Sequence, residues 1–147
     1  MKIYRKEIQI ESKKQVDFID VTEQVRDVVE ASGIRQGQVL VFAQHTTMSV
    51  VINHKEDMLE QDLMRMLDKI APMDQQYSHD MFEIRKNNAK ADGRSNGHSH
   101  CKSFLMGNSE VVPLDKGELL LSNLQTIFAI DFDGVRSRDV MVQVMGL

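Results

Sequence analysis

The chain has 147 residues, a formal net charge of −4 and a calculated pI near 5.7. This length suits one ordinary domain with its own core, and 41% hydrophobic and 27% charged residues are typical of a soluble globular protein. The acidic balance and the aromatic content of 5% argue against a general nucleic-acid-binding protein, which usually carries a clustered basic excess. No apolar run approaches the roughly 20 residues that span a bilayer, so no membrane partner is expected.

A single cysteine, Cys101, excludes an internal disulfide framework and fits a reducing compartment. The first residues are charged and lack the apolar segment of a signal peptide. We therefore expect a cytoplasmic protein. No repeat, low-complexity tract or linker divides the sequence, so residues 1–147 are predicted to form one domain.

The first half of the chain mixes strand and helix patterns. Residues 3–10 and 16–20 are predicted strands, with apolar residues on one face of the first. A helix is predicted next, because Asp20 or Thr22 can cap it and valines recur at helical spacing up to Gly33, a typical C-terminal glycine. Residues 38–44 are nearly all apolar, which predicts a strand buried on both faces.

The clearest helix follows. Leu59, Leu63, Met66, Leu67 and Ile70 recur at helical spacing until Pro72, and Asp57 is the predicted cap.

Residues 71–97 are polar and irregular, which in a compact domain usually marks a functional or disordered connection. Beyond it, short β-rich segments separated by glycine-bearing turns predict strands at 103–106, 110–113, 118–121, 127–132 and 139–145. Asp133-Gly134 suggests a hairpin between the last two. Many short strands with two main helices indicate an α+β class rather than a doubly wound parallel sheet.

His98 and His100 are separated by one residue and form the most distinctive motif. In an extended segment their side chains would share a face, with alpha carbons roughly 6.5–7 Å apart. Two imidazoles so placed can bind one metal ion, zinc being well suited. The alternative is a chance pairing, since such spacing is common.

His45-Thr46-Thr47 directly follows the predicted strand at 38–44. At a strand end, an imidazole and two hydroxyls can bind a metal or a phosphate or transfer a proton. The alternative is that all three satisfy the backbone of a loop.

Lys102, Arg136 and Arg138 could contact an anionic substrate, because a guanidinium fork suits phosphate oxygens. The alternative for the two arginines is surface pairing with Asp131 or Asp133.

Three further side chains have local interpretations only. His79 has an acidic neighbour but locally resembles an exposed loop histidine. Gln125, within an apolar segment, is either a structural hydrogen-bond hub or a substrate contact. Cys101 is interpreted as a packing residue.

Several motifs occur in order along the chain: His45-Thr46-Thr47, Asn53 with Glu56-Asp57, the run from Asn96 to Ser103, Gly107, Val112-Pro113, Gly117, Leu119, Leu121, Gln125, Ile127-Phe128, Asp133-Gly134, Arg136 and Arg138. This ordered set resembles the YjbQ family, often labelled secondary thiamine-phosphate synthase. The resemblance covers nearly the whole chain.

The resemblance implies a compact α+β domain rich in antiparallel strands, with sandwich- or barrel-like sheets, that assembles as a homotrimer. It also implies a histidine-lined site with a divalent metal, zinc or magnesium. The metal ligands, by matched position, would be His45, His79, His98 and His100. The catalytic residues would be His45, Thr46, Thr47, His100 and Gln125. The phosphate of the substrate would be bound by Lys102 and Arg136.

The chain departs from the family pattern at several positions, among them Ser122-Asn123 in place of a Leu-Gly pair. Leu124 replaces a tryptophan, Asp131 replaces a glutamate, Val135 replaces a proline and His54 replaces a glutamate. No catalytic role is therefore carried over to Leu124 or Asp131.

These observations favour a metal-assisted enzyme acting on a phosphorylated small molecule. The family label implies joining a hydroxymethylpyrimidine pyrophosphate to a thiazole phosphate with release of pyrophosphate, as a main or a side activity. The alternative is a non-catalytic trimeric module that binds a metal or a small ligand.

Overall fold

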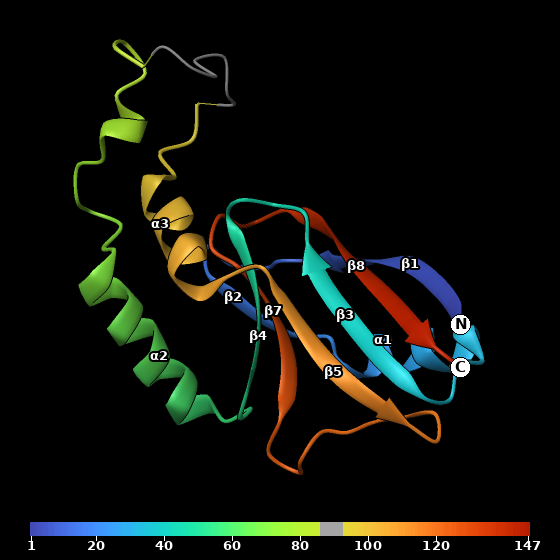
Figure 1. Ribbon diagram of the computed structural model, residues 1–147. Coiled ribbons are helices and arrows are strands. Elements are labelled where there is room, and N and C mark those ends of the chain that lie inside the picture. The colour runs from blue at the N-terminus through green and yellow to red at the C-terminus, as the bar shows by residue number, and fades with distance from the viewer. Residues whose placement is uncertain (86–92) are drawn as a thin grey trace.

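The computed structural model describes residues 1–85 and 93–147 (Figure 1). The elements in chain order are β1 (Lys2–Glu11), β2 (Asp17–Asp20), α1 (Thr22–Ser32), β3 (Gly37–Ala43), β4 (Met48–Asn53), α2 (Asp57–Ile70), the 3-10 turn η1 (Ser78–Asp80), α3 (Gly97–Met106), β5 (Ser109–Asp115), β6 (Glu118–Leu119), β7 (Thr126–Asp131) and β8 (Ser137–Gly146). The predicted α+β class, rich in antiparallel strands, is confirmed.

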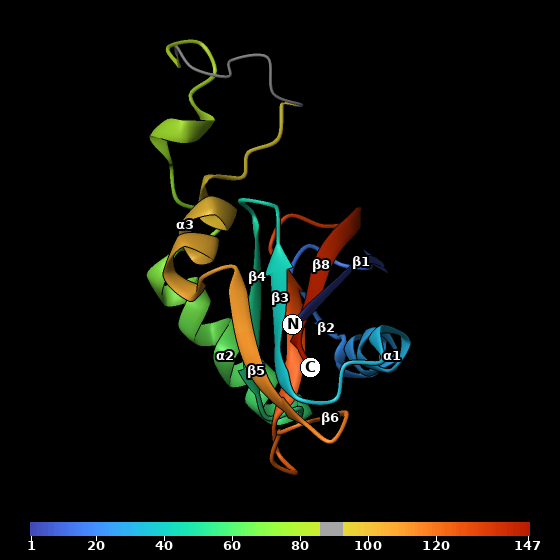
Figure 2. The same cartoon turned by 45° about the vertical axis from the view of Figure 1, so that its right-hand side comes forward.

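The strands form two antiparallel sheets. The larger sheet has the order β1-β8-β3-β5-β6, and the smaller has the order β2-β7-β4. Helix α1 lies on one side of the sheets, and α2 and α3 lie on the other (Figure 2). The chain therefore crosses between the sheets several times, and strand ends from both sheets come together.

Two hydrophobic clusters lie on opposite faces of the smaller sheet. The main cluster joins the inner face of the larger sheet to α1 and to one face of β4 and β7. The second joins Phe128, Ile130 and Phe132 to Leu67 of α2. Strand β7 is consequently buried on both faces, which its apolar sequence requires.

The N-cap of α1 is Val21, which makes no side-chain capping bond, so the predicted cap at Asp20 or Thr22 is wrong, although the carboxylate of Asp20 accepts a hydrogen bond from the backbone N–H of Thr22. The predicted C-terminal glycine is confirmed, because Gly33 ends α1 with φ +65°. The cap of α2 is Glu56, whose carboxylate accepts from the backbone N–H of Leu59, so the predicted cap at Asp57 is wrong by one residue.

The predicted strand at 103–106 is wrong, because these residues end helix α3. The buried face of α3 is polar and is formed by His98, Ser99, Lys102 and Ser103. Phe104 and Leu105, by contrast, are 92% and 53% exposed. Hydrophobic periodicity therefore gave no helical signal here.

Two further strand predictions are corrected. Asp133-Gly134 does not form a hairpin, because β7 and β8 belong to different sheets and the segment crosses between them. Strand β3 is fully buried on one face only, since no other element covers the outer face of the larger sheet among the described residues. Strand β4 was not predicted, although Met48, Ser49 and Val50 are buried within it.

The polar connection between α2 and α3 contains η1, and residues 86–92 of it lie outside the described part. The carboxylate of Asp80 in η1 accepts from the backbone N–H of Gly97. This bond holds η1 at the first turn of α3.

Gly37 and Gly33 offer a matched test of backbone packing. Gly37 (φ +152°) pairs with Gly146 across β3 and β8, and a Cβ there would strike the carbonyl oxygen of Met145. Gly33 has open space around its Cβ position. We expect Gly37→Ala to lower the free energy of unfolding by about 3 kcal/mol, and Gly33→Ala by about 1 kcal/mol, in urea titrations. Equal losses would contradict this account of the β3–β8 pairing.

Candidate functional site

An open cleft of about 440 Å³ lies where β3 ends and β8 begins, beside the first turns of α3. Its lining residues are Gln44, His45, Thr46, Thr47, Asn96, His100, Arg136 and Arg138. An adjoining hollow on the side of Phe104 shares His45, Thr46 and His100. His45-Thr46-Thr47 therefore lies just after the end of a strand, as predicted, and lines a surface cleft.

The floor of the cleft is a buried ion pair. Arg138 donates from Nε and Nη2 to the two carboxylate oxygens of Asp131, at 3.1 and 2.9 Å, and both residues are almost fully buried. Nη2 also donates to the hydroxyl of Thr47 at 2.7 Å. The alternative interpretation of Arg138, pairing with Asp131, is thus correct in partner, but the pair is buried rather than on the surface.

Asp131 accepts more hydrogen bonds than those of Arg138. Its oxygens also accept from the hydroxyl of Ser12 and from the backbone N–H of Asp133. Burial alone would raise the pKa of Asp131, but these donors and the positive charge of Arg138 together hold it below the usual value.

His45 lies beside the ion pair, with its Nδ1 atom 3.3 Å from Nη1 of Arg138. Burial is the largest effect lowering the pKa of His45, and the charge of Arg138 adds to it. A hydrogen bond to the backbone carbonyl of Asp139 acts in the opposite direction. The neutral imidazole is therefore the favoured form at neutral pH.

His100 and His79 meet at the α3 side of the cleft. Their ring centroids are 4.6 Å apart, with the planes at 69°. Burial lowers the pKa of His100, and the neighbouring His79 lowers it further. Although one residue lies between His98 and His100, the helix turns their side chains roughly 200° apart.

His98 consequently faces the interior. Its Nδ1 atom is 3.0 Å from Nζ of Lys102, one helical turn on, and the two side chains are almost fully buried. Asp68 of α2 lies 4.0 Å from the same Nζ. Burial is the main cause of the lowered pKa of both His98 and Lys102. The shared face predicted for His98 and His100 is therefore wrong.

A second buried carboxylate, Asp133, gathers polar side chains at the rim. Arg136 donates to it at 3.1 Å and Asn96 at 3.1 Å, while Arg94 donates to its side chain and its backbone carbonyl. This is the pairing of Arg136 that the sequence left open. It ties the loop before α3 to the crossover between β7 and β8.

The structure brings only part of the predicted site together. His45, Thr46, Thr47, His100 and Arg136 line the cleft, and His79 touches His100. Gln125 is exposed at the far end of β7, roughly 20 Å of strand from Asp131, and accepts from the backbone N–H of Ser122. In this chain Gln125 and Lys102 do not line the cleft, and their predicted roles stay predictions.

Two lining residues were missed as site residues, Gln44 and Asn96, and Arg138 was given no more weight than surface pairing. Asn96 carried a usable signal, because asparagine is a preferred residue at a helix N-terminus and Gly107 follows α3. Cys101 is exposed on α3, so its interpretation as a packing residue is wrong.

The cleft has imidazole side chains of the kind that bind zinc, but within the described residues too few of them lie together to form a complete metal site. Among residues 1–85 and 93–147, no three histidine, cysteine or acidic side chains are arranged to hold a metal ion. His79 and His100 supply two adjacent imidazoles, whereas catalytic zinc sites use three protein ligands. A metal here would need a further donor from a ligand or another chain.

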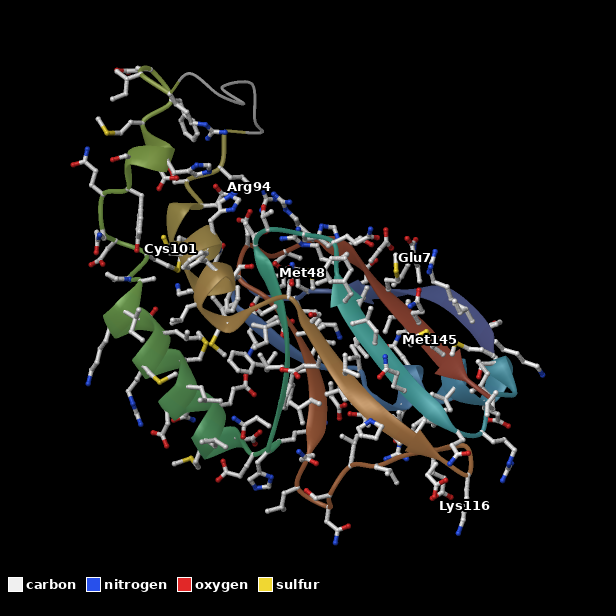
Figure 3. The ribbon with its side chains drawn as sticks, viewed as in Figure 1. Glu7, Met48, Arg94, Cys101, Lys116 and Met145 are labelled. Atoms are coloured by element: carbon white, nitrogen blue, oxygen red, sulfur yellow. The ribbon has the colours of Figure 1, made fainter. Side chains whose placement is uncertain are left out.

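Another groove lies at the opposite end of the molecule from Arg94, around Lys116 (Figure 3). It mixes the cations Arg26, Arg35 and Lys116 with Glu30 and Glu118. The cleft at His45 differs from it because none of its lining residues is acidic.

Comparison with known proteins identifies the family. The family model described as UPF0047 protein YjbQ-like matches residues 6–147. The chain belongs to the YjbQ-like UPF0047 family. A UPF0047 protein of Archaeoglobus fulgidus is 37% identical over 95% of this chain and 99% of its own length, and one of Methanothermobacter thermautotrophicus is 34% identical over 99% and 94%.

Solved structures of the family share the fold. A YbjQ-like protein from Sulfolobus solfataricus superposes with a TM-score of 0.88 at 28% identity, covering 99% of each chain. A YjbQ/UPF0047 protein from Clostridium acetobutylicum gives 0.82 at 32% identity, covering 95% of this chain and 98% of its own. The resemblance inferred from the motifs is confirmed. Within the described part of this family member, no helix is long and apolar enough to cross a membrane.

One buried and two half-buried histidines predict a pH-dependent stability. The pKa values of His45, His98 and His100 are lowered in the folded chain, so between the folded and unfolded pKa values the unfolded chain binds more protons. Stability should therefore fall as pH drops from 7.5 through about 6.5, the usual histidine value, to 5.5. Urea midpoints at the two pH values test this. His98→Gln should reduce the difference, and midpoints independent of pH would contradict it.

Proposed function

We propose that the cleft binds a phosphorylated small molecule and acts in a transfer reaction of the secondary thiamine-phosphate synthase type. The observation that carries the proposal is the lining itself, which has two guanidinium groups, two imidazoles, two hydroxyls, two amides and no carboxylate. Such a lining offers directed donors to phosphate oxygens and no like charge to repel them.

In this reaction the thiazole nitrogen attacks the methylene carbon of the pyrimidine. The bond from that carbon to the pyrophosphate oxygen breaks, and its electron pair leaves with the pyrophosphate. Catalysis then requires donors placed where negative charge develops, together with a pocket that orients the two substrates. We assign charge stabilisation to Arg136, His45 and His100, which line one continuous cleft with Thr46 and Thr47.

His79 and His100 would hold a divalent metal, zinc or magnesium, with phosphate oxygens completing its coordination. When bound, the metal would neutralise charge on the leaving group. The adjacent pair of imidazoles also favours the second candidate function, a non-catalytic module that binds a metal or small ligand.

We also propose the homotrimer and a cytoplasmic location. The trimer is supported by apolar side chains on the outer face of the larger sheet in the described part of the chain. Ile3 and Val111 are exposed there, and Leu40, Phe42, Met141 and Met145 are half-buried. The location rests on the single cysteine.

Arg136→Ala and His100→Ala should each lower kcat/KM for pyrophosphate release about 100-fold, because each removes a donor to the developing charge. The measurement is pyrophosphate release from the hydroxymethylpyrimidine pyrophosphate and thiazole phosphate pair. Arg26→Ala is the matched control, since Arg26 also pairs with an acid three residues away but lies on α1. Unchanged turnover in both site variants would exclude this activity for the cleft.

Protein purified without a histidine tag should contain a divalent metal that His100→Ala loses and His54→Ala retains, because His54 is exposed away from the cleft. Elemental analysis per subunit, with the molar mass from light scattering, tests the metal and the trimer together. Wild-type protein that contains the metal but does not release pyrophosphate from the substrate pair would favour the non-catalytic binding module. Metal that persists in His100→Ala would place it elsewhere.

A further inference from the structure

The ion pair beneath the cleft fixes one edge of the Arg138 guanidinium. Nε and Nη2 each donate a hydrogen bond to the carboxylate of Asp131, and the second N–H of Nη2 donates to the hydroxyl of Thr47. A guanidinium is planar and carries five N–H donors. Two of the five therefore remain, both on Nη1.

Nη1 is the guanidinium nitrogen that Asp131 does not bind. Within the described residues its one hydrogen-bonding neighbour is Nδ1 of His45, at 3.3 Å, and both Arg138 and His45 line the cleft. At most one of its two N–H groups can be directed at that nitrogen. The other is a donor at the cleft floor.

We propose that Arg138 is the anchor for the phosphoryl group of the ligand and that Asp131 is its positioning residue. The inference rests on the proposed function and adds to it the atom, Nη1, that recognises the tetrahedral anion. The sequence offered Arg138 only as one of three possible contacts to an anionic substrate, beside Lys102 and Arg136, and gave Asp131 no role beyond pairing with an arginine.

Rigidity distinguishes Arg138 from Arg136. The side chain of Arg138 is 3% exposed and held by four hydrogen bonds, whereas that of Arg136 is 27% exposed. A buried, pre-oriented donor loses little conformational freedom when a ligand binds and is less screened by salt than an exposed one. Arg138 therefore orients the bound phosphoryl group, whereas Arg136 lies nearer the solvent at the rim of the cleft.

Asp131 makes this orientation possible. Its four donors, two from Arg138 and one each from Ser12 and the backbone of Asp133, leave it no freedom to rotate toward the cleft. The carboxylate thus neutralises Arg138 from below and keeps its oxygens occupied by donors other than those of the cleft. Recognition then depends on a directed N–H rather than on net charge.

The test measures binding of inorganic pyrophosphate by titration calorimetry, in EDTA, to the full chain. Arg138→Lys keeps the charge but loses the fork, so its affinity should fall at least about tenfold. Because this variant leaves Asp131 differently paired, the double variant Asp131→Asn/Arg138→Gln, which removes both charges, should show the same loss. Arg35→Lys, in the groove at the far end, is the matched control and should bind as the wild type does.

The outcomes separate this inference from the function beneath it. Wild-type protein that does not bind pyrophosphate would overturn the phosphate-binding function and the anchor with it. Wild-type binding that a folded Arg138→Lys or double variant retains in full would overturn the anchor alone. Circular dichroism identifies which variants are folded. A loss of pyrophosphate affinity in a folded Arg138 variant, together with unchanged binding by Arg35→Lys, supports Arg138 as the phosphoryl anchor.

Discussion

The constraint on which the site depends is a carboxylate with no exposed surface at the end of a strand buried on both faces. Strand β7 is held between two hydrophobic clusters, and Asp131 is its last residue. A buried charge is tolerated only when it is paired and hydrogen-bonded. The partners come from three other places in the sequence: Ser12 after β1, Arg138 in β8 and the backbone of Asp133.

Satisfying that carboxylate positions the cleft. Arg138 reaches from the larger sheet to a residue of the smaller one, and the same guanidinium binds Thr47 and lies against His45 in the turn between β3 and β4. Buried ion pairs add little net stability compared with a well-packed apolar replacement, but removing one partner leaves the other charge buried and unpaired, which is strongly destabilising. The pair therefore fixes which side chains of two sheets meet in one place.

The sequence predicted the strands and helices whose apolar residues repeat at a regular spacing. Both α1 and α2 were found from such repeats, as was the strand that became β1, whereas β3 was found from a nearly continuous apolar run and β7 from a short β-rich segment between turns. Helix α3 was missed because its buried residues, His98 and Lys102 among them, are polar while Phe104 is exposed. The tertiary environment reversed the pattern on which helix prediction relies.

Only the part of the site that local motifs reveal could be predicted from the sequence. His45-Thr46-Thr47, His100 and Arg136 were found from local motifs and all line the cleft, and the family resemblance added metal, catalytic or phosphate-binding roles for them. The separation of His98 from His100 required knowing that the segment is helical. The role of Asp131 and Arg138 required knowing that β7 and β8 lie in different sheets, which a local turn signal at Asp133-Gly134 contradicted.

The polar interior of α3 has a consequence for how the cleft is supported. Ser99 donates to the backbone carbonyl of Phe132, and Ser103 donates to that of Met48, so α3 is joined to the ends of β7 and β4 by hydrogen bonds with fixed directions. Apolar packing alone would allow the helix to rotate or slide over the sheet, whereas two such bonds define its register. His100 is carried on this helix, and its distance from His45 in the turn after β3 is therefore set by the same strand ends that hold Asp131.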